Sequence, residues 1–145
     1  MTQRWLREVI ETTLSAQKVD RPVELSLIIT GDKEVHKLNR DYRGIDKTTD
    51  VISFVLSENA EGSEFVTPPD HIWHLGEIVI SYPQAASQAR ENRQTVKAEM
   101  AWLMVHGLLH LLGYDHQDDR SDDVMRKRED KILGEIATWK TKNKC

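Results

Sequence analysis

Three histidines close together in the chain are the side chains best suited to chemistry. His106, His110 and His116 lie within a segment of eleven residues. His106 and His110 are four residues apart, so on a helix they share one face, with Cβ atoms about 5–6 Å apart. Two imidazoles at that separation can bind one metal ion at the zinc–nitrogen distance of about 2.0–2.1 Å. The spacing therefore predicts a metal site.

Gly113 provides the bend that the third histidine needs. Glycine adopts a positive φ without a Cβ clash, so the chain can reverse after the helix and bring His116 back toward the other two. The pattern His-x3-His-x2-Gly-x2-His is that of three-histidine zinc sites. Ordinary polar residues beside a core helix would not need this spacing or this glycine. Three nitrogen ligands also leave a fourth position for water, so we predict a catalytic Zn²⁺.

The residue after the first histidine argues against peptide hydrolysis. Zinc peptidases with this spacing carry a glutamate there as the general base, whereas this chain has Gly107. A glycine inside a helix costs about 1 kcal/mol relative to alanine, so a local benefit is expected. Two benefits remain open: room for a substrate, and close packing against a neighbouring element.

The missing glutamate does not exclude hydrolysis of a phosphodiester. Zinc lowers the pKa of its bound water from about 15.7 to about 7, which provides hydroxide at neutral pH. What remains is to hold the substrate and to stabilise charge in the transition state. For a phosphodiester, the planar bidentate fork of a guanidinium suits that task.

Two further segments carry recognisable motifs. Residues 38–54 read LNRDYRGIDKTTDVISF, and residues 75–80 read LGEIVI. Together with residues 106–116, they resemble in order the signatures of the YbeY family of bacterial endoribonucleases, which are rRNA maturation factors. The departures from the family pattern fall outside the three histidines: Thr48 and Val55 where proline is common, and Glu77 where aspartate is more usual.

This resemblance implies a zincin-like fold and metal-dependent cleavage of single-stranded RNA. It implies that His106, His110 and His116 bind zinc and that Arg43 grips the phosphate, so His110 and Arg43 are the predicted catalytic residues. It further implies late-stage 16S rRNA 3′-end maturation and ribosome quality control. The expected partners are the 16S rRNA precursor and the ribosome or small-subunit proteins, with no DNA and no membrane. The nucleophile, zinc-bound water or the RNA 2′-hydroxyl, stays open.

Two other functions compete with this one. A three-histidine zinc metallopeptidase or amidase fits the spacing but is opposed by Gly107. A non-catalytic ribosome assembly factor with structural zinc is opposed by the open fourth position at the metal.

Other polar residues receive more ordinary interpretations. Asp115 either orients a ligand or caps the turn, and both roles remain open. The segment from Arg126 to Lys144 is expected to present a solvated helix face. The remaining histidines are expected at the surface: His36, His71 and His74.

The elements that must position these residues follow from hydrophobic spacing. An apolar helix over residues 94–112 carries two of the histidines, and Gly113 is its expected C-terminal cap. Alternating or β-branched segments predict three strands, over residues 23–29, 51–56 and 75–80. Other expected elements are helices over residues 2–17, from about residue 32, over residues 84–92 and from Ser121, and a long loop over residues 57–72.

The order of these elements predicts the fold class. Strands come early in the chain and helices late, which favours an α+β fold with a small mixed sheet of about three to four strands and about five helices. The chain has 145 residues, which is typical of one domain, so residues 1–145 are expected to form a single domain.

Composition and charge exclude several further classes of protein. Lysine and arginine total 20 against 24 acidic residues, and the net charge of −4 excludes a protein whose whole surface attracts nucleic acid. No apolar run approaches the roughly 18 residues of a membrane span. The first residues are interrupted by charge, which argues against a signal peptide, and the single cysteine, Cys145, cannot close an internal disulfide. We therefore expect a cytoplasmic protein.

Overall fold

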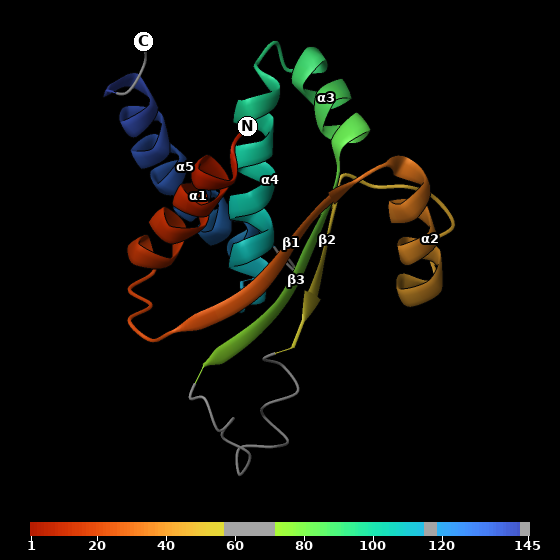
Figure 1. Cartoon of the computed structure of the whole chain (residues 1–145), viewed down its shortest axis with the longest axis horizontal. Coiled ribbons are helices and arrows are strands. Elements are labelled where there is room, and N and C mark those ends of the chain that lie inside the picture. Colours follow the sequence, from red (N-terminus) through yellow and green to blue (C-terminus); the bar gives the residue numbers. More distant parts are fainter. Residues whose placement is uncertain (57–71, 115–118, 143–145) are drawn as a thin grey trace.

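The computed structural model of the chain describes residues 1–56 and 72–114, the backbone of 119–142, and within that last stretch the side chains of 123–136. The described part confirms the predicted α+β class with a small mixed sheet. Its elements, in chain order, are α1 (Gln3–Ala16), β1 (Val23–Thr30), α2 (Asp32–Arg43), β2 (Val51–Val55), β3 (Trp73–Ser81), α3 (Tyr82–Glu91), α4 (Val96–Leu111) and α5 (Asp119–Lys142) (Figure 1).

The last strand in the sequence occupies the centre of the sheet. The strand order is β1-β3-β2. β1 runs parallel to β3, with Val23 opposite Trp73, and β2 runs antiparallel to β3, with Val51 opposite Ile80. Within the described residues, β1 and β2 are therefore the two edges of the sheet.

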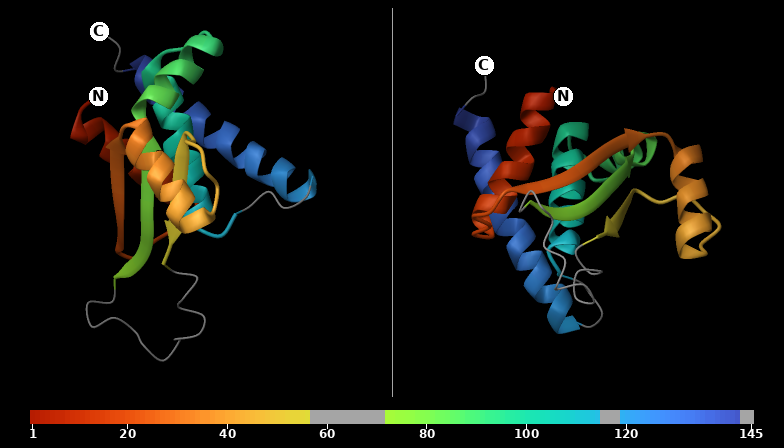
Figure 2. Two further views of the ribbon diagram at one scale, coloured as in Figure 1. Left: turned by 90° about the vertical axis from the view of Figure 1, so that its right-hand side faces the viewer. Right: turned by 60° about the horizontal axis from the view of Figure 1, so that its bottom comes forward.

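Helices cover both faces of this sheet. Alternate side chains of β2 point to opposite faces: Ile52 packs with Val35 of α2 in a small cluster, whereas Val51 packs against the main core. That core lies between the sheet and α4, and α1 and α5 also contribute to it. α2 and α4 thus lie on opposite sides of the sheet (Figure 2).

α4 is the most deeply buried helix of the described chain. Each fully buried large apolar side chain contributes about 1.5–3 kcal/mol, so this helix supplies much of the stability of the fold. No helix in the described part has the length and apolar character needed to cross a bilayer. The α4 residues with at most 1% of their surface exposed are Met100, Leu103, Met104, Val105, Leu108, Leu109 and Leu111.

Most predicted boundaries agree with the structure. Thr95 caps the start of α4, where its hydroxyl accepts a hydrogen bond from the amide of Ala98. Gly113 adopts φ +107° just after the C-cap residue of α4, as expected for a helix-ending glycine. α5 begins at Asp119 rather than at Ser121. Nearly all of the predicted loop, residues 57–71, lies outside the described residues.

Asp32 joins three elements near one end of the sheet. The N-cap residue of α2 is Gly31, which has no capping side chain. The carboxylate of Asp32 instead accepts hydrogen bonds from the Ser81 hydroxyl at 2.6 Å, the Gln84 amide at 3.3 Å and the Thr48 hydroxyl at 3.3 Å. These bonds, that from Ser81 foremost, hold the pKa of Asp32 below its ordinary value.

This network predicts a pH-dependent contribution to stability. Because the pKa is lower in the folded state, the stabilisation is fully present above the unfolded-state pKa of about 3.8 and is lost as the pH falls through the folded-state pKa. We therefore expect Asp32→Asn to lower the free energy of unfolding near neutral pH and to have little effect at strongly acidic pH. Urea unfolding of both proteins across this range measures the difference. A pH-independent difference would contradict the prediction.

Gly76 permits β2 and β3 to approach at an irregularity of the sheet. The β1–β3 register shifts beside Gly76, and this residue adopts φ +139°. A Cβ atom there would lie 1.9 Å from the carbonyl oxygen of Phe54, which belongs to the neighbouring strand. Both the backbone angle and the close contact exclude other residues.

We expect Gly76→Ala to lower the free energy of unfolding by more than about 1 kcal/mol, because the native conformation is incompatible with alanine. The matched control is Gly134→Ala in α5, where an added Cβ meets nothing within 4 Å. Helix propensity predicts that this control is neutral or stabilises by up to about 1 kcal/mol. Chemical denaturation measures the free energy of unfolding of both variants. Equal changes in the two would show that Gly76 has no special conformational requirement.

Candidate active site

The two histidines of α4 lie on the least buried side of this helix. From Glu99 to the end of α4, the partly exposed residues are Trp102, His106 and His110, and all others are buried. These three are spaced four residues apart, so they form one stripe along the helix. The prediction that His106 and His110 share a face is therefore confirmed, and that face is accessible.

The side chains of this stripe contact one another. The rings of His106 and His110 lie edge to face, with centroids 4.8 Å apart and planes at 78°. Trp102 stacks on the other side of His106, with centroids 5.0 Å apart and planes at 23°. Two imidazoles at this separation fit a metal that takes nitrogen ligands.

Glu129 of α5 forms a hydrogen bond with the ring of His106. Its Oε2 lies 2.5 Å from Nδ1 of His106, and the two side chains are 6% and 16% exposed. A carboxylate only accepts hydrogen bonds, so Nδ1 donates in this pair, and a metal would bind His106 through Nε2. Metal-binding histidines in proteins usually have such a partner on the second ring nitrogen, which supports His106 as a ligand.

The sequence alone does not single out Glu129, which contacts one of the predicted ligands. The sequence predicts a solvated face for the segment from Arg126 to Lys144, and its basic residues up to Lys131 are exposed. Glu129, however, is buried. The available signal was spacing, because Glu129 stands in the helical stripe of buried residues formed by Met125, Glu129, Ile132 and Ile136.

Gly107 is explained by close packing rather than by room for a substrate. A Cβ at this position would lie 3.0 Å from Cγ2 of Ile78 and 3.2 Å from Oγ of Ser53. Ser53 also donates a hydrogen bond to the carbonyl oxygen of Gly107 at 3.2 Å. A glutamate side chain would point into the sheet here, so this position cannot hold the general base of a zinc peptidase.

The third predicted ligand is not placed. His116 and Asp115 both lie outside the described residues. Across the described side chains, no three histidine, cysteine, aspartate or glutamate residues are grouped closely enough to hold a metal. The structure thus brings together His106 and His110, and the ligand role of His116 stays a prediction.

Arg43 lies away from the histidines. It is the last residue of α2, it is exposed, and its guanidinium has no hydrogen bond or ion pair with a described residue. Its neighbour Tyr42 is 71% exposed and packs edge-on against Phe54, with ring centroids 5.6 Å apart. Because α2 and α4 cover opposite faces of the sheet, the edge strand β2 lies between Arg43 and the histidine pair.

The other placed histidines are surface residues, as predicted. His36 pairs with Asp46 at 2.7 Å, and His74 pairs with Glu24 at 3.0 Å. His71 lies outside the described residues.

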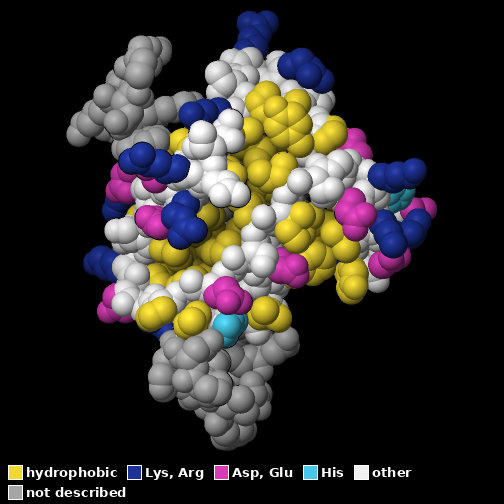
Figure 3. All heavy atoms as spheres, in the orientation of Figure 1, with side chains coloured by type: hydrophobic (Ala, Val, Ile, Leu, Met, Phe, Trp, Pro, Cys, Tyr) yellow, Lys and Arg dark blue, Asp and Glu magenta, His cyan; other side chains and the backbone are white. Residues whose placement is uncertain are grey.

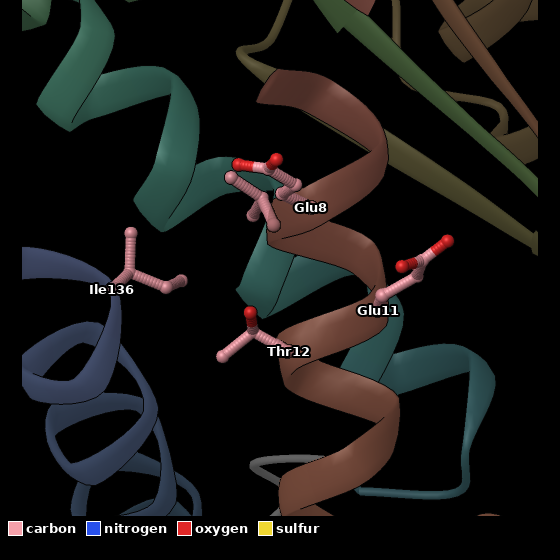
Figure 4. A pocket seen from close by; sticks show the side chains of 5 residues that line it. Glu8, Glu11, Thr12 and Ile136 are labelled. Atoms are coloured by element: carbon pink, nitrogen blue, oxygen red, sulfur yellow. The ribbon is translucent and has the colours of Figure 1, made fainter. Parts of the chain in front are cut away.

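A hollow elsewhere in the molecule lacks the features of a catalytic site. It lies between α1 and α5, and the described residues of its lining include no histidine and no cationic side chain (Figure 4). Its residues are Glu8, Val9, Glu11, Thr12 and Ile136.

The sheet and the histidine stripe define the class: an α+β protein whose buried central helix presents paired histidines. Residues 1–137 match the family model described as "Endoribonuclease YbeY". The chain belongs to the YbeY endoribonuclease family.

Individual relatives agree with this assignment. A protein named Endoribonuclease YbeY from Dehalococcoides mccartyi is 44% identical over 141 residues, which cover 94% of this chain and 88% of that protein. One of the same name from Roseiflexus castenholzii is 44% identical over 133 residues, covering 91% and 82%. The solution structure of TM1509 from Thermotoga maritima superposes with a TM-score of 0.63 at 26% identity, covering 97% of this chain and 87% of that one.

Proposed function

We propose that this protein is a zinc-dependent endoribonuclease that cleaves single-stranded RNA. Its substrate would be the 16S rRNA precursor, in late-stage 3′-end maturation and ribosome quality control, in the cytoplasm and in contact with the ribosome or small-subunit proteins. The observation that carries the proposal is the accessible pair His106 and His110 on α4, in a chain of the YbeY family.

The proposed metal ligands are His106, His110 and His116. A bound zinc ion would supply an acidified water and a Lewis acid for a phosphoryl oxygen. The chain's own contribution is to hold the first two imidazoles on a rigid, buried helix. Glu129 fixes the orientation of the His106 ring. The close packing of Gly107 on the sheet fixes the distance between α4 and the sheet.

Arg43 is proposed to grip a phosphate of the RNA strand. Its guanidinium is exposed and makes no ion pair with a described residue, so a bidentate contact with phosphate would not displace an existing partner. Since β2 separates it from the histidine pair, the bound RNA strand would have to pass around β2, which is an edge strand among the described residues, to reach both.

Charge elsewhere on the surface offers only limited support for RNA binding. Lysine and arginine side chains are scattered among acidic ones on the face shown in Figure 3. α2 carries a short basic stripe of Lys33, Lys37 and Arg40, which lines a shallow hollow together with Glu34. We therefore expect RNA binding to depend less steeply on salt than in a strongly basic RNA-binding domain.

Zinc dependence is tested with the histidine variants. We expect His106→Ala and His110→Ala each to abolish cleavage of a single-stranded RNA and to reduce the zinc content of the purified protein, because each removes a ligand. Chelation should abolish wild-type activity, and zinc should restore it. Zinc content by mass spectrometry and cleavage by gel assay are the measurements.

The control for these variants is His36→Ala, a surface histidine that pairs with Asp46. It should keep both zinc and activity. Cleavage that persists in His110→Ala, or activity that resists chelation, would overturn the proposal. Hydrolysis of peptides rather than RNA would favour a metallopeptidase or amidase instead. Zinc binding without any hydrolysis would favour a non-catalytic assembly factor.

The role of Arg43 has its own test. Loss of a charge-assisted hydrogen bond costs about 1.5–3 kcal/mol, so Arg43→Ala should lower kcat/KM for RNA by about 10- to 100-fold. Arg43→Lys should recover only part of this, since lysine lacks the planar fork. Arg7→Ala removes an exposed arginine from α1 and is the matched control. If both alanine variants behave alike, Arg43 has no specific role.

A further inference from the structure

Glu129 is an acidic side chain in a helical stripe that is otherwise apolar. Its neighbours in the stripe, Met125, Ile132 and Ile136, are at most 5% exposed and belong to the main core. Burial of a carboxylate is unfavourable unless a hydrogen bond compensates for the lost water. The Nδ1 of His106 provides that bond at 2.5 Å.

We propose that Glu129 is the positioning residue for His106, and that it sets the affinity of the site for a divalent metal. The inference rests on the proposed function, because it assumes that His106 is a ligand. Glu129 itself would not touch the metal. It would keep the proton on Nδ1 and thereby make Nε2 the nitrogen that binds.

The surroundings of His106 restrict the ring from two sides. Trp102 stacks on one face of the imidazole, with centroids 5.0 Å apart, and the Glu129 bond prevents rotation within that stack. The ring of His110 lies edge to face with the ring of His106, with centroids 4.8 Å apart. With His106 fixed in this way, less conformational freedom is lost when a metal binds, and the binding geometry is defined before the metal arrives.

The proposal also assigns α5 a part in the site. His106 lies on α4 and Glu129 on α5, so the hydrogen bond joins two helices that also pack together in the apolar core. A displacement of α5 would release the ring of His106. Metal affinity should therefore depend on a helix that carries none of the predicted ligands in its described part.

The decisive experiment compares Glu129→Gln with Glu135→Gln. Both variants remove one negative charge from α5, but Glu135 is exposed. Zinc affinity is measured by competition with a chromophoric chelator, and the free energy of unfolding of the metal-free proteins is measured in parallel. We expect Glu129→Gln to weaken zinc binding by about 10- to 100-fold, the usual effect of losing such a partner. Glu135→Gln should stay within about two-fold of wild type.

A second measurement reports on the ring directly. The ¹⁵N chemical shifts of the imidazole nitrogens of His106 in the metal-free protein identify the protonated nitrogen. We expect the Nδ1–H form in the wild type and a mixture of both forms in Glu129→Gln, because a glutamine amide can either accept from Nδ1 or donate to it. Glu129→Ala is informative only if it folds, so the glutamine variant carries the test.

The outcomes separate the proposed zinc-dependent function from the positioning role of Glu129. A wild-type protein that binds no zinc overturns the proposed function and this inference together. If the wild type binds zinc and Glu129→Gln binds it equally well, the inference alone is overturned, and Glu129 is a purely structural residue. The same conclusion follows if Glu129→Gln lowers stability while zinc affinity and the tautomer of His106 stay unchanged.

Discussion

The close approach of α4 to the sheet at Gly107 sets the position of the histidine pair. With only a hydrogen atom at this position, the helix backbone comes close enough for Ser53 to bond the carbonyl oxygen of Gly107. The sheet then buries one side of α4, and α1, α3 and α5 bury most of the rest. From Glu99 to the end of α4, what remains partly exposed is a narrow stripe of three side chains, two of which are the histidines. The packing of the core thus determines which residues face solvent.

The sequence was sufficient for the elements and for the histidine pair because both depend on local spacing. Strand alternation and the period of the helix are properties of neighbouring residues, and the separation of His106 and His110 on a helix is fixed by geometry. The contact of Glu129 with His106 joins residues 23 positions apart, and no local pattern specifies such a pairing. The separation of Arg43 from the histidines also depends on tertiary structure, since it follows from which face of the sheet each helix covers.

A partly buried polar pair between helices differs in kind from the apolar packing around it. Apolar contacts are non-directional and tolerate small shifts, whereas a hydrogen bond requires a particular distance and angle. The bond between Glu129 and His106 therefore restricts how α5 can lie on α4 more narrowly than Met125 or Ile132 can. This defined placement of α5 on α4 suits a metal site whose ligands must keep fixed positions relative to one another.

The central position of β3 has a consequence for how the chain folds. Glu24 and its partner His74 are 50 residues apart, and β1 and β2, though made earlier, are not paired with each other. Among the described strands, β1 and β2 each pair only with β3, which is the last of the three to be synthesised. Closing such long loops is slow compared with helix formation. Formation of this sheet therefore depends on contacts between segments that are distant in the sequence, because its central strand is the last of the three described strands.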